Sequence, residues 1–181
     1  MMNWLRHNFV ASVLLTIIRI YLGFEWMMGG LNKLTMKGGF SSKGLIANAI
    51  QNPVQSPKGT AYPLYTEFLK VITSNGKNTQ VFDFLVSWGE LLVGLGLIVG
   101  LLTIPAVFFA LVMNFSYIFA GTISVNPWYI LLEFFIIMAG FNAGKIGLDR
   151  SVTPWLRKKL PFLRKHGETE VRVDKAINAY K

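Results

Sequence analysis

The chain has 181 residues, of which 52% are hydrophobic, and its mean hydropathy is +0.45. It contains no cysteine, and both histidines, His7 and His166, lie outside the apolar tracts, so no disulfide framework, haem or iron–sulfur cluster is expected in this chain. The net charge is +9, but ten of the eighteen basic residues fall between Lys145 and Lys181, directly after the last apolar tract. This placement, with no nucleic-acid-binding motif, predicts membrane lipids and no nucleic acid as partners.

The first apolar tract runs from about residue 9 to residue 28 and contains Arg19 and Glu25. A signal peptide is the competing interpretation, because Arg6 precedes the tract. However, the tract continues through both charged residues, and no small-residue cleavage site follows an apolar core. We therefore interpret it as a retained transmembrane span.

The next segment, residues 31–80, has mixed polarity and is predicted to be an extramembrane loop with two short helices. Ser41 or Ser42 would cap the first of these helices. The Asn52-Pro53 pair would stop it, since proline cannot continue a helix and restricts the residue before it.

The second short helix is expected to open at Pro63, because proline suits the first helical turn, and to end at Gly76. Its apolar face would carry Leu64, Phe68 and Ile72. The pattern is compatible with a folded extramembrane loop and with a helix that lies flat on the membrane surface.

Three further spans are predicted at about residues 81–102, 104–122 and 127–146. No residue from Leu91 to Val125 is charged. Since one span needs about 20 apolar residues, this tract predicts a hairpin of two spans. A buried hairpin of a soluble protein is the alternative.

The predicted fold is all-α: an integral membrane four-helix bundle in residues 1–150, followed by a basic tail in residues 151–181. Pro105 fits the first turn of the third span, where its missing N–H costs nothing. Pro154 is expected to open a short basic segment of the tail.

The distribution of lysine and arginine predicts the orientation. The connections between the second, third and fourth spans carry none, the first loop carries six lysines, and the C-terminal flank carries ten basic residues. With four spans both termini share one side, and the C-terminal flank places that side in the cytoplasm. The six lysines favour the opposite orientation, although a loop of that length orients spans weakly.

Four ionisable side chains lie deep in the predicted spans: Arg19, Glu25, Glu90 and Glu133. Such groups normally face the bundle interior and find partners, because they are costly in lipid. Helical spacing places all except Glu25 on stripes with small residues, which allow close helix packing. The stripes are Arg19-Gly23-Trp26-Gly30-Lys33, Glu90-Gly94, Ala110-Asn114-Tyr117-Gly121 and Glu133-Gly140-Gly144-Gly147.

Pointing these stripes at a common axis places Arg19 near mid-depth, paired with Glu90 or Glu133. One arginine cannot neutralise three glutamates, so at least one carboxyl is expected to be protonated, to pair with a ligand or to reach water. A carboxyl beside a membrane cavity suits proton exchange, for instance with a quinol hydroxyl. Glu90, Glu133 and Arg19 are therefore the candidate catalytic residues, and an ion pair that only fixes helix register is the alternative role for Arg19.

Trp26 and Trp88 lie near charged groups at the outer ends of adjacent spans, where they could wall a ring-shaped ligand. Trp4, Trp128, Tyr129 and Trp155 fall at span ends and are interpreted as interfacial anchors. The candidate ligand-binding residues are Arg19, Glu25, Trp26, Lys33, Trp88, Asn114 and Tyr117.

Three motifs occur in order along the chain: Arg19, Gly23, Trp26, Gly30 and Lys33; Glu90 and Gly94 with Gly100-Leu101-Leu102-Thr103 and Ala106; and Gly144, Gly147, Leu148 and Asp149. Together they resemble the DoxX family of small bacterial four-helix membrane proteins. The resemblance covers about residues 17–150, and the long first loop is similar to the DoxD-like branch.

This resemblance implies a bacterial cytoplasmic membrane protein with links to quinone chemistry. DoxD-type members are associated with thiosulfate:quinone oxidoreductase, in which thiosulfate is oxidised to tetrathionate and the electrons pass to membrane quinone. Applied to this chain, the resemblance implies a diffusible quinone as the cofactor and a second oxidoreductase subunit as a partner, since a chain without cysteine is poorly suited to accept sulfur electrons alone.

The leading hypothesis is therefore a membrane subunit of a quinone-linked oxidoreductase. A small-molecule transporter or channel that uses the same polar axis is the first alternative. A membrane scaffold that recruits a soluble redox enzyme through its basic tail is the second.

Overall fold

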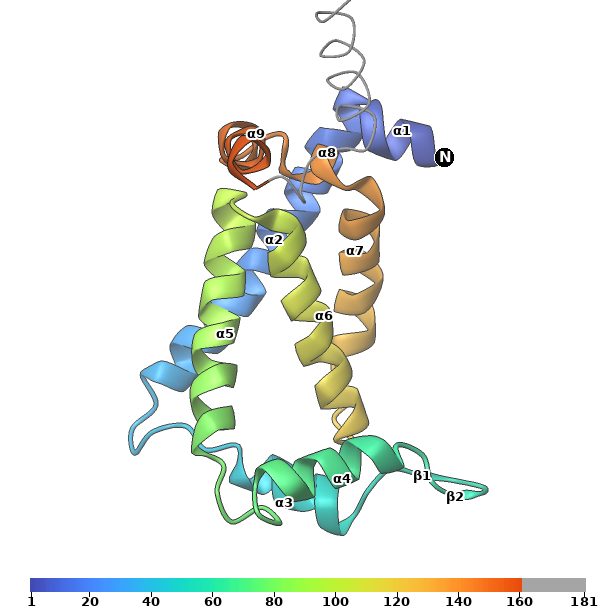
Figure 1. The fold of residues 1–181 in the computed structure, drawn as a ribbon, viewed down its shortest axis with the longest axis vertical. Coiled ribbons are helices and arrows are strands. Elements are labelled where there is room, and N and C mark those ends of the chain that lie inside the picture. Colours follow the sequence, from blue (N-terminus) through green and yellow to red (C-terminus); the bar gives the residue numbers. More distant parts are fainter. Residues whose placement is uncertain (161–181) are drawn as a thin grey trace, which may run out of the picture.

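The computed structural model describes residues 1–160, which form helices and one short β-hairpin (Figure 1). The rest of the predicted basic tail, from residue 161, lies outside the described residues. In chain order the elements are α1 (Met2–His7), α2 (Phe9–Leu34), α3 (Lys43–Gln51), β1 (Gln55–Ser56), β2 (Gly59–Thr60), α4 (Pro63–Ile72), α5 (Gln80–Val99), α6 (Thr103–Phe119), α7 (Asn126–Ala139), α8 (Phe141–Gly144) and α9 (Asp149–Lys159).

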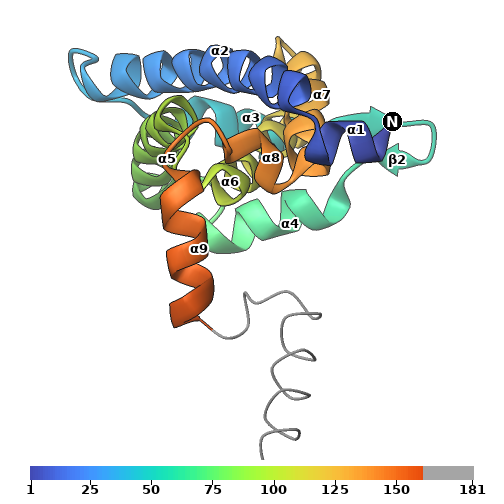
Figure 2. The ribbon, with the colours of Figure 1, turned by 90° about the horizontal axis from the view of Figure 1, so that it is seen from above.

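The main core lies between the apolar helices α2, α5, α6 and α7. Seen from above, α5, α6 and α7 stand nearly end-on, and α2 crosses them obliquely along one side (Figure 2). One buried cluster takes side chains from all four helices: Leu15, Leu22, Leu97, Val107 and Ile136. The all-α prediction is confirmed.

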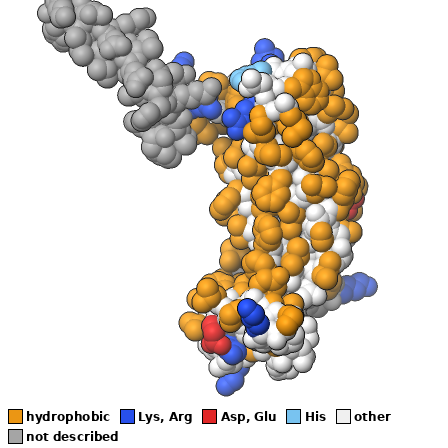
Figure 3. Space-filling model, turned by 90° about the vertical axis from the view of Figure 1, so that its right-hand side faces the viewer, with side chains coloured by type: hydrophobic (Ala, Val, Ile, Leu, Met, Phe, Trp, Pro, Cys, Tyr) orange, Lys and Arg blue, Asp and Glu red, His pale blue; other side chains and the backbone are white. Residues whose placement is uncertain are grey.

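The outer surface of these helices is apolar. Each carries an exposed phenylalanine: Phe24 (52%), Phe84 (61%), Phe108 (55%) and Phe134 (44%). Apolar side chains cover the middle of the face in Figure 3, whereas lysines and arginines lie toward its two ends. Soluble proteins rarely expose so extended an apolar surface, so this arrangement indicates a membrane protein.

Two of the helices, α2 and α5, are long and apolar enough to cross a membrane. The other two are shorter, with 17 residues in α6 and 14 in α7. At about 1.5 Å per residue these correspond to about 26 Å and 21 Å, against a hydrocarbon core of about 30 Å. The number of spans, four, stays a prediction.

Glycines bring α2 and α5 into close contact. A Cβ added to Gly23 would lie 2.9 Å from the carbonyl oxygen of Gly94, and one added to Gly94 would lie 2.7 Å from the carbonyl oxygen of Gly23. A Cβ on Gly30 would likewise meet the backbone of Leu91. The predicted small-residue stripes of these two helices therefore do form an interior seam.

The first long helix extends further than predicted. It starts where the sequence indicated, because the Asn8 side chain accepts hydrogen bonds from the amides of Val10 and Ala11 and so caps it. It continues to Leu34 rather than 28, so the predicted loop start at residue 31 is wrong. The polar end stays helical because Lys33 turns inward to a carboxylate on α5.

The turn between α5 and α6 is longer than predicted, and the predicted end of the second span at residue 102 is wrong. Helix α5 ends at Val99, since Gly100 adopts a left-handed conformation (φ 69°), and α6 begins at Thr103. Pro105 lies in the first turn of α6, as expected.

The predicted fourth span, 127–146, is not one helix. Gly140 interrupts it with φ 60° and ψ −132°, a backbone conformation that side-chain-bearing residues rarely adopt, and α8 follows in a new direction. The predicted opening of a helix at Pro154 is also wrong, because α9 starts at Asp149 and Pro154 lies inside it. An acidic residue suits that first turn, since the N-terminus of a helix is electropositive.

The first loop folds across one end of the bundle, where α3 and α4 lie beneath α5 and α6 in Figure 1. Helix α3 follows Ser42, but this side chain does not cap it. Instead the Ser42 amide and hydroxyl donate to Asp83 Oδ1 on α5, at 2.5 and 2.6 Å. This pair of bonds fastens the loop to the bundle.

Helix α4 starts at Pro63 as predicted and ends at Ile72, four residues before Gly76. Its predicted apolar face is exposed: Leu64 is 87%, Phe68 49% and Ile72 52% exposed. The hairpin β1–β2 between α3 and α4 was not predicted, because strands of two residues are too short for an alternating pattern.

Candidate functional site

A polar cavity of about 150 Å³ lies between α2, α5, α6 and α7. It is lined by Glu25, Trp26, Gly29, Lys33, Glu90, Asn114, Tyr117, Asn126 and Tyr129. We call it the polar cavity. Its residues come from four helices and span positions 25 to 129, so only the folded bundle assembles it.

The first carboxyl of the cavity belongs to an ion pair. Lys33 Nζ lies 2.5 Å from Glu90 Oε2, and the Tyr117 hydroxyl donates to Glu90 Oε1 at 2.6 Å. The Glu90 side chain is 5% exposed and the Lys33 side chain 22% exposed. Burial excludes competing water, so the hydrogen bonds from Lys33 and Tyr117 fix the position of the Glu90 carboxyl group.

The second carboxyl has neutral partners. This carboxyl, Glu133, is fully buried and lies behind the cavity lining rather than on it. Asn114 Nδ2 donates to both of its oxygens at 2.9 Å, and Trp26 Nε1 donates to Oε1 at 3.2 Å. No lysine or arginine of residues 1–160 forms an ion pair with it. The hydrogen-bond partners of the Glu133 carboxyl are therefore an amide and an indole, whereas Glu90 has a cation beside it.

Asn114 also presents an unused acceptor. Its Nδ2 is committed to Glu133, whereas its Oδ1 is buried and finds no hydrogen-bond partner within the described part of the chain. A buried acceptor without a donor costs about 1–3 kcal/mol. Because Asn114 lines the polar cavity, a ligand hydroxyl there would supply the missing donor.

The third carboxyl lies at the edge of the cavity. Glu25 is partly exposed, and the Tyr129 hydroxyl donates to its Oε2 at 3.1 Å. The Tyr129 ring lies 6.5 Å from the Trp26 ring, between centroids, and 6.3 Å from that of Tyr21. One side of the cavity is thus aromatic.

The predicted pairing of Arg19 with Glu90 or Glu133 is wrong. Arg19 is 1% exposed, and its Nη2 donates to the Ile146 carbonyl at 2.7 Å, near the other end of the bundle. Seven residues separate Arg19 from Trp26, which is about 10 Å along a helix, so one stripe carries both side chains at different depths.

Trp88 does not wall the cavity either. It is 43% exposed on the outside of α5 and packs against Phe84 at 6.2 Å between ring centroids. It precedes Glu90 by two residues, which is about 200° around a helix, so the two side chains face opposite sides. Of the nine predicted site residues, six line the cavity. Glu133 lies behind the lining and is hydrogen-bonded to Asn114 and Trp26, whereas Arg19 and Trp88 lie elsewhere.

Sequence reasoning missed Tyr129, Asn126 and Gly29. Tyr129 was interpreted as an interfacial anchor, yet it points into the cavity, whereas its neighbour Trp128 is 54% exposed. A signal was present, because Tyr129 lies four residues before Glu133 and three after Asn126, on one helical face.

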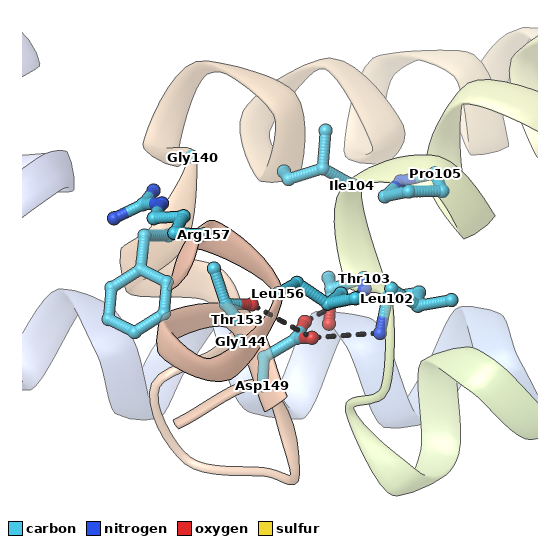
Figure 4. A pocket seen from close by; sticks show the side chains of 11 residues that line it. Leu102, Thr103, Ile104, Pro105, Gly140, Gly144, Asp149, Thr153, Leu156 and Arg157 are labelled. Carbon is cyan, nitrogen blue, oxygen red and sulfur yellow. Dashed lines mark hydrogen bonds between the residues drawn. The ribbon is translucent and has the colours of Figure 1, made fainter. Parts of the chain in front are cut away.

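A second pocket, of about 350 Å³, lies at the opposite end, where α6, α8 and α9 meet (Figure 4). Asp149 lines it and accepts hydrogen bonds from the amides of Leu102 and Thr103, each at 2.8 Å. Asp149 thereby caps α6 from another helix. The rest of the lining is mainly apolar, including Ile104 and Leu156, so the chemistry concentrates at the polar cavity.

Comparison with known proteins gives one match. A family model described as DoxX matches residues 14–122, a range that contains seven of the nine residues that line the polar cavity. No curated protein and no solved structure matches the chain.

Proposed function

Because the chain belongs to the DoxX family of membrane proteins, we propose that it is the membrane subunit of a quinone-linked oxidoreductase and binds the quinol ring in the polar cavity. The observation that carries this proposal is the buried, unpartnered Oδ1 of Asn114 in a cavity with aromatic walls. A quinol hydroxyl is a donor of the required kind.

The size of the cavity supports a single ring. An apolar cavity of about 150 Å³ engineered in another protein holds one benzene molecule. The polar cavity here is about 150 Å³, and Trp26 and Tyr129 offer ring faces on one side. Quinol hydroxyls could donate to Asn114, and quinone carbonyls could accept from the ammonium group of Lys33, which has three donors.

The carboxyls supply places for protons. Bound quinone and quinol exchange two electrons and two protons, and this chain would manage the protons. Glu133 adjoins the proposed hydroxyl site through Asn114, and the partly exposed Glu25 with Tyr129 lies at the edge where protons could leave.

The electrons would come from a partner subunit. With thiosulfate as the donor, two thiosulfate ions form one tetrathionate ion, and quinone takes up the two electrons released together with two protons. A chain without cysteine is poorly suited to the sulfur step, so that step belongs to the partner in this proposal.

Binding of a quinol to the purified protein tests the proposal. Asn114→Leu should raise the Kd for the quinol at least tenfold, since about 1.4 kcal/mol is a factor of ten and the lost hydrogen bond is buried. It should affect the corresponding quinone less, because carbonyl oxygens cannot donate to Asn114.

Asn142→Leu is the matched control. Asn142 is also buried, but its amide donates to the carbonyls of Leu5 and Asn8 at the other end of the bundle. This variant should lose stability and keep its quinol affinity. An unchanged quinol affinity in a folded Asn114→Leu protein would count against the proposal.

A further inference from the structure

A third cavity, of about 170 Å³, lies beside the polar cavity, between the loop helices and the bundle. Helix α3 contributes Leu45, α4 contributes Leu69, α5 contributes Phe82, and α6 contributes Val112 and Met113. Its lining is mainly apolar, and we call it the apolar cavity. Tyr65 of α4 also lines it, and burial raises the pKa of that phenol, so the group stays neutral.

The two cavities share one wall. Tyr117 lines both of them, and its hydroxyl faces the polar side, where it donates to Glu90. Met113 lies beside Tyr117 on α6 and contacts α5 at Gly89, where an added Cβ would lie 3.4 Å from its sulfur. Methionine side chains adapt their shape readily, so this wall can yield to a chain that passes through it.

The apolar cavity opens between α5 and α6. Leu85 on α5 and Val112 on α6 line it and are 55% and 47% exposed. They belong to the same outward surface as the exposed Phe84 and Phe108. Because that surface is the apolar one of a membrane protein, the opening leads to lipid rather than to water.

The folded first loop closes the cavity from the side away from the bundle centre. Leu69 is 1% exposed there, and Ser42 fastens α3 to Asp83 of α5. This contact gives α3 and α4 a definite position beneath the ends of α5 and α6 in Figure 1. The loop helices thus form one wall of the apolar cavity.

We propose that the ligand whose ring occupies the polar cavity carries an apolar tail that runs past Tyr117 and Met113 through the apolar cavity into the lipid. This inference rests on the proposed function and adds the path of the ligand's tail, so that a tailed quinol should bind in preference to a small water-soluble phenol. It also assigns the loop helices a role in substrate selection. A protein segment fits the opening less well, because its backbone polar groups would lie unpaired in lipid.

The test compares two ligands in lipid nanodiscs: a tailless dimethoxymethylbenzoquinol and its decyl homologue, decylubiquinol. In the wild-type protein the decyl form should bind at least tenfold more tightly, relative to its partition into protein-free discs. Val112→Trp fills the mouth of the apolar cavity and should remove most of this preference without changing the affinity for the tailless quinol. Leu85→Trp, from the other side of the mouth, should do the same and serves if the first variant does not fold.

Val13→Trp is the matched control, because Val13 is 37% exposed on α2 and lines neither cavity. It should leave both affinities unchanged. If the tailless quinol binds and the mouth variants leave the decyl preference intact, the tail takes another route and the inference fails alone. If the wild-type protein binds neither quinol, the proposed function fails as well.

Discussion

The ionisable side chains buried inside the apolar helices differ in the kind of group that they bind. Arg19 donates to a backbone carbonyl, Glu90 pairs with Lys33, and Glu133 takes hydrogen bonds from neutral groups. The Lys33–Glu90 pair differs from the other described ion pair, Lys70–Glu67, whose side chains are 35% and 65% exposed. Water screens the exposed pair, so only the buried one should matter for stability.

Replacement of Lys33 tests this difference. Lys33→Met leaves the Glu90 carboxylate buried without its cation and should lower the free energy of unfolding by about 3 kcal/mol. Lys70→Met, the control, should cost less than about 1 kcal/mol. Reversible unfolding in mixed micelles measures both.

The double variant Lys33→Met/Glu90→Gln separates the ion pair from packing. It should recover a large part of the loss, because it removes the unpaired charge as well. Equal losses in Lys33→Met and Lys70→Met would show that Glu90 does not depend on Lys33.

Most of the candidate site could be predicted from residue spacing. Glu90, Asn114 and Tyr117 lie on the inward faces because the helical period settles which way a side chain points. The helical period does not determine how far along the bundle axis a side chain lies, so the predicted pairing of Arg19 with Glu90 or Glu133 was wrong. Its true acceptor, the Ile146 carbonyl, becomes available only because the chain leaves α7 at Gly140, a change of direction that apolar composition does not reveal.

At the scale of elements, the α2–α5 pair depends on the absence of side chains at a few positions. Gly94 faces the backbone of both Gly23 and Met27, so nothing flexible could move aside for a methyl group. Oblique crossing of α2 over its neighbours follows from this close approach (Figure 2).

A single added methyl group tests the seam. Gly94→Ala should lower the free energy of unfolding by about 2 kcal/mol through overpacking, even though alanine favours helix. Gly44→Ala in α3 is the matched control, since an added Cβ there meets nothing within 4 Å, and it should be neutral or slightly stabilising. Thermal unfolding of both variants measures the difference, and a Gly94→Ala protein as stable as the control would remove the seam from the explanation.

Only some of the helix boundaries could be predicted from proline and glycine positions. Proline correctly marked the starts of α4 and α6, because its backbone preference is local. The end of α5 was placed too late, at residue 102, although Gly100 ends the helix at Val99. Pro154 was misleading, because α9 had already started at Asp149 and continues past the proline to Lys159.

At the scale of the whole molecule, the membrane topology depends on whether the two shorter helices, α6 and α7, cross the membrane completely. If they do, the α6–α7 turn emerges on the same side as the first loop. If they do not, it stays on the side of the termini. The absence of cysteine makes this easy to decide, because single cysteines can be introduced without a background.

Labelling of Thr122→Cys with a membrane-impermeant maleimide on intact cells decides between these topologies. Four spans with cytoplasmic termini predict that Thr122→Cys is labelled from outside, as Lys58→Cys in the hairpin is. Ser151→Cys on α9 should react only after the membrane is opened. All three positions are exposed. If Thr122→Cys behaves like Ser151→Cys instead, only α2 and α5 cross.

The cap that Asp149 provides to α6 can form only late in the synthesis of the chain. The amide of Leu102 leaves the ribosome 47 residues ahead of the carboxylate that it needs, and Arg19 emerges 127 residues ahead of its carbonyl acceptor. At about 5–20 residues per second, these delays are roughly 2–10 s and 6–25 s. During that interval the Leu102 amide and the Arg19 side chain need other hydrogen-bond partners, such as the insertion machinery or lipid head groups. The C-terminal helices therefore supply contacts that the earlier helices lack, and a chain that stalls before residue 149 leaves an incompletely folded bundle in the membrane.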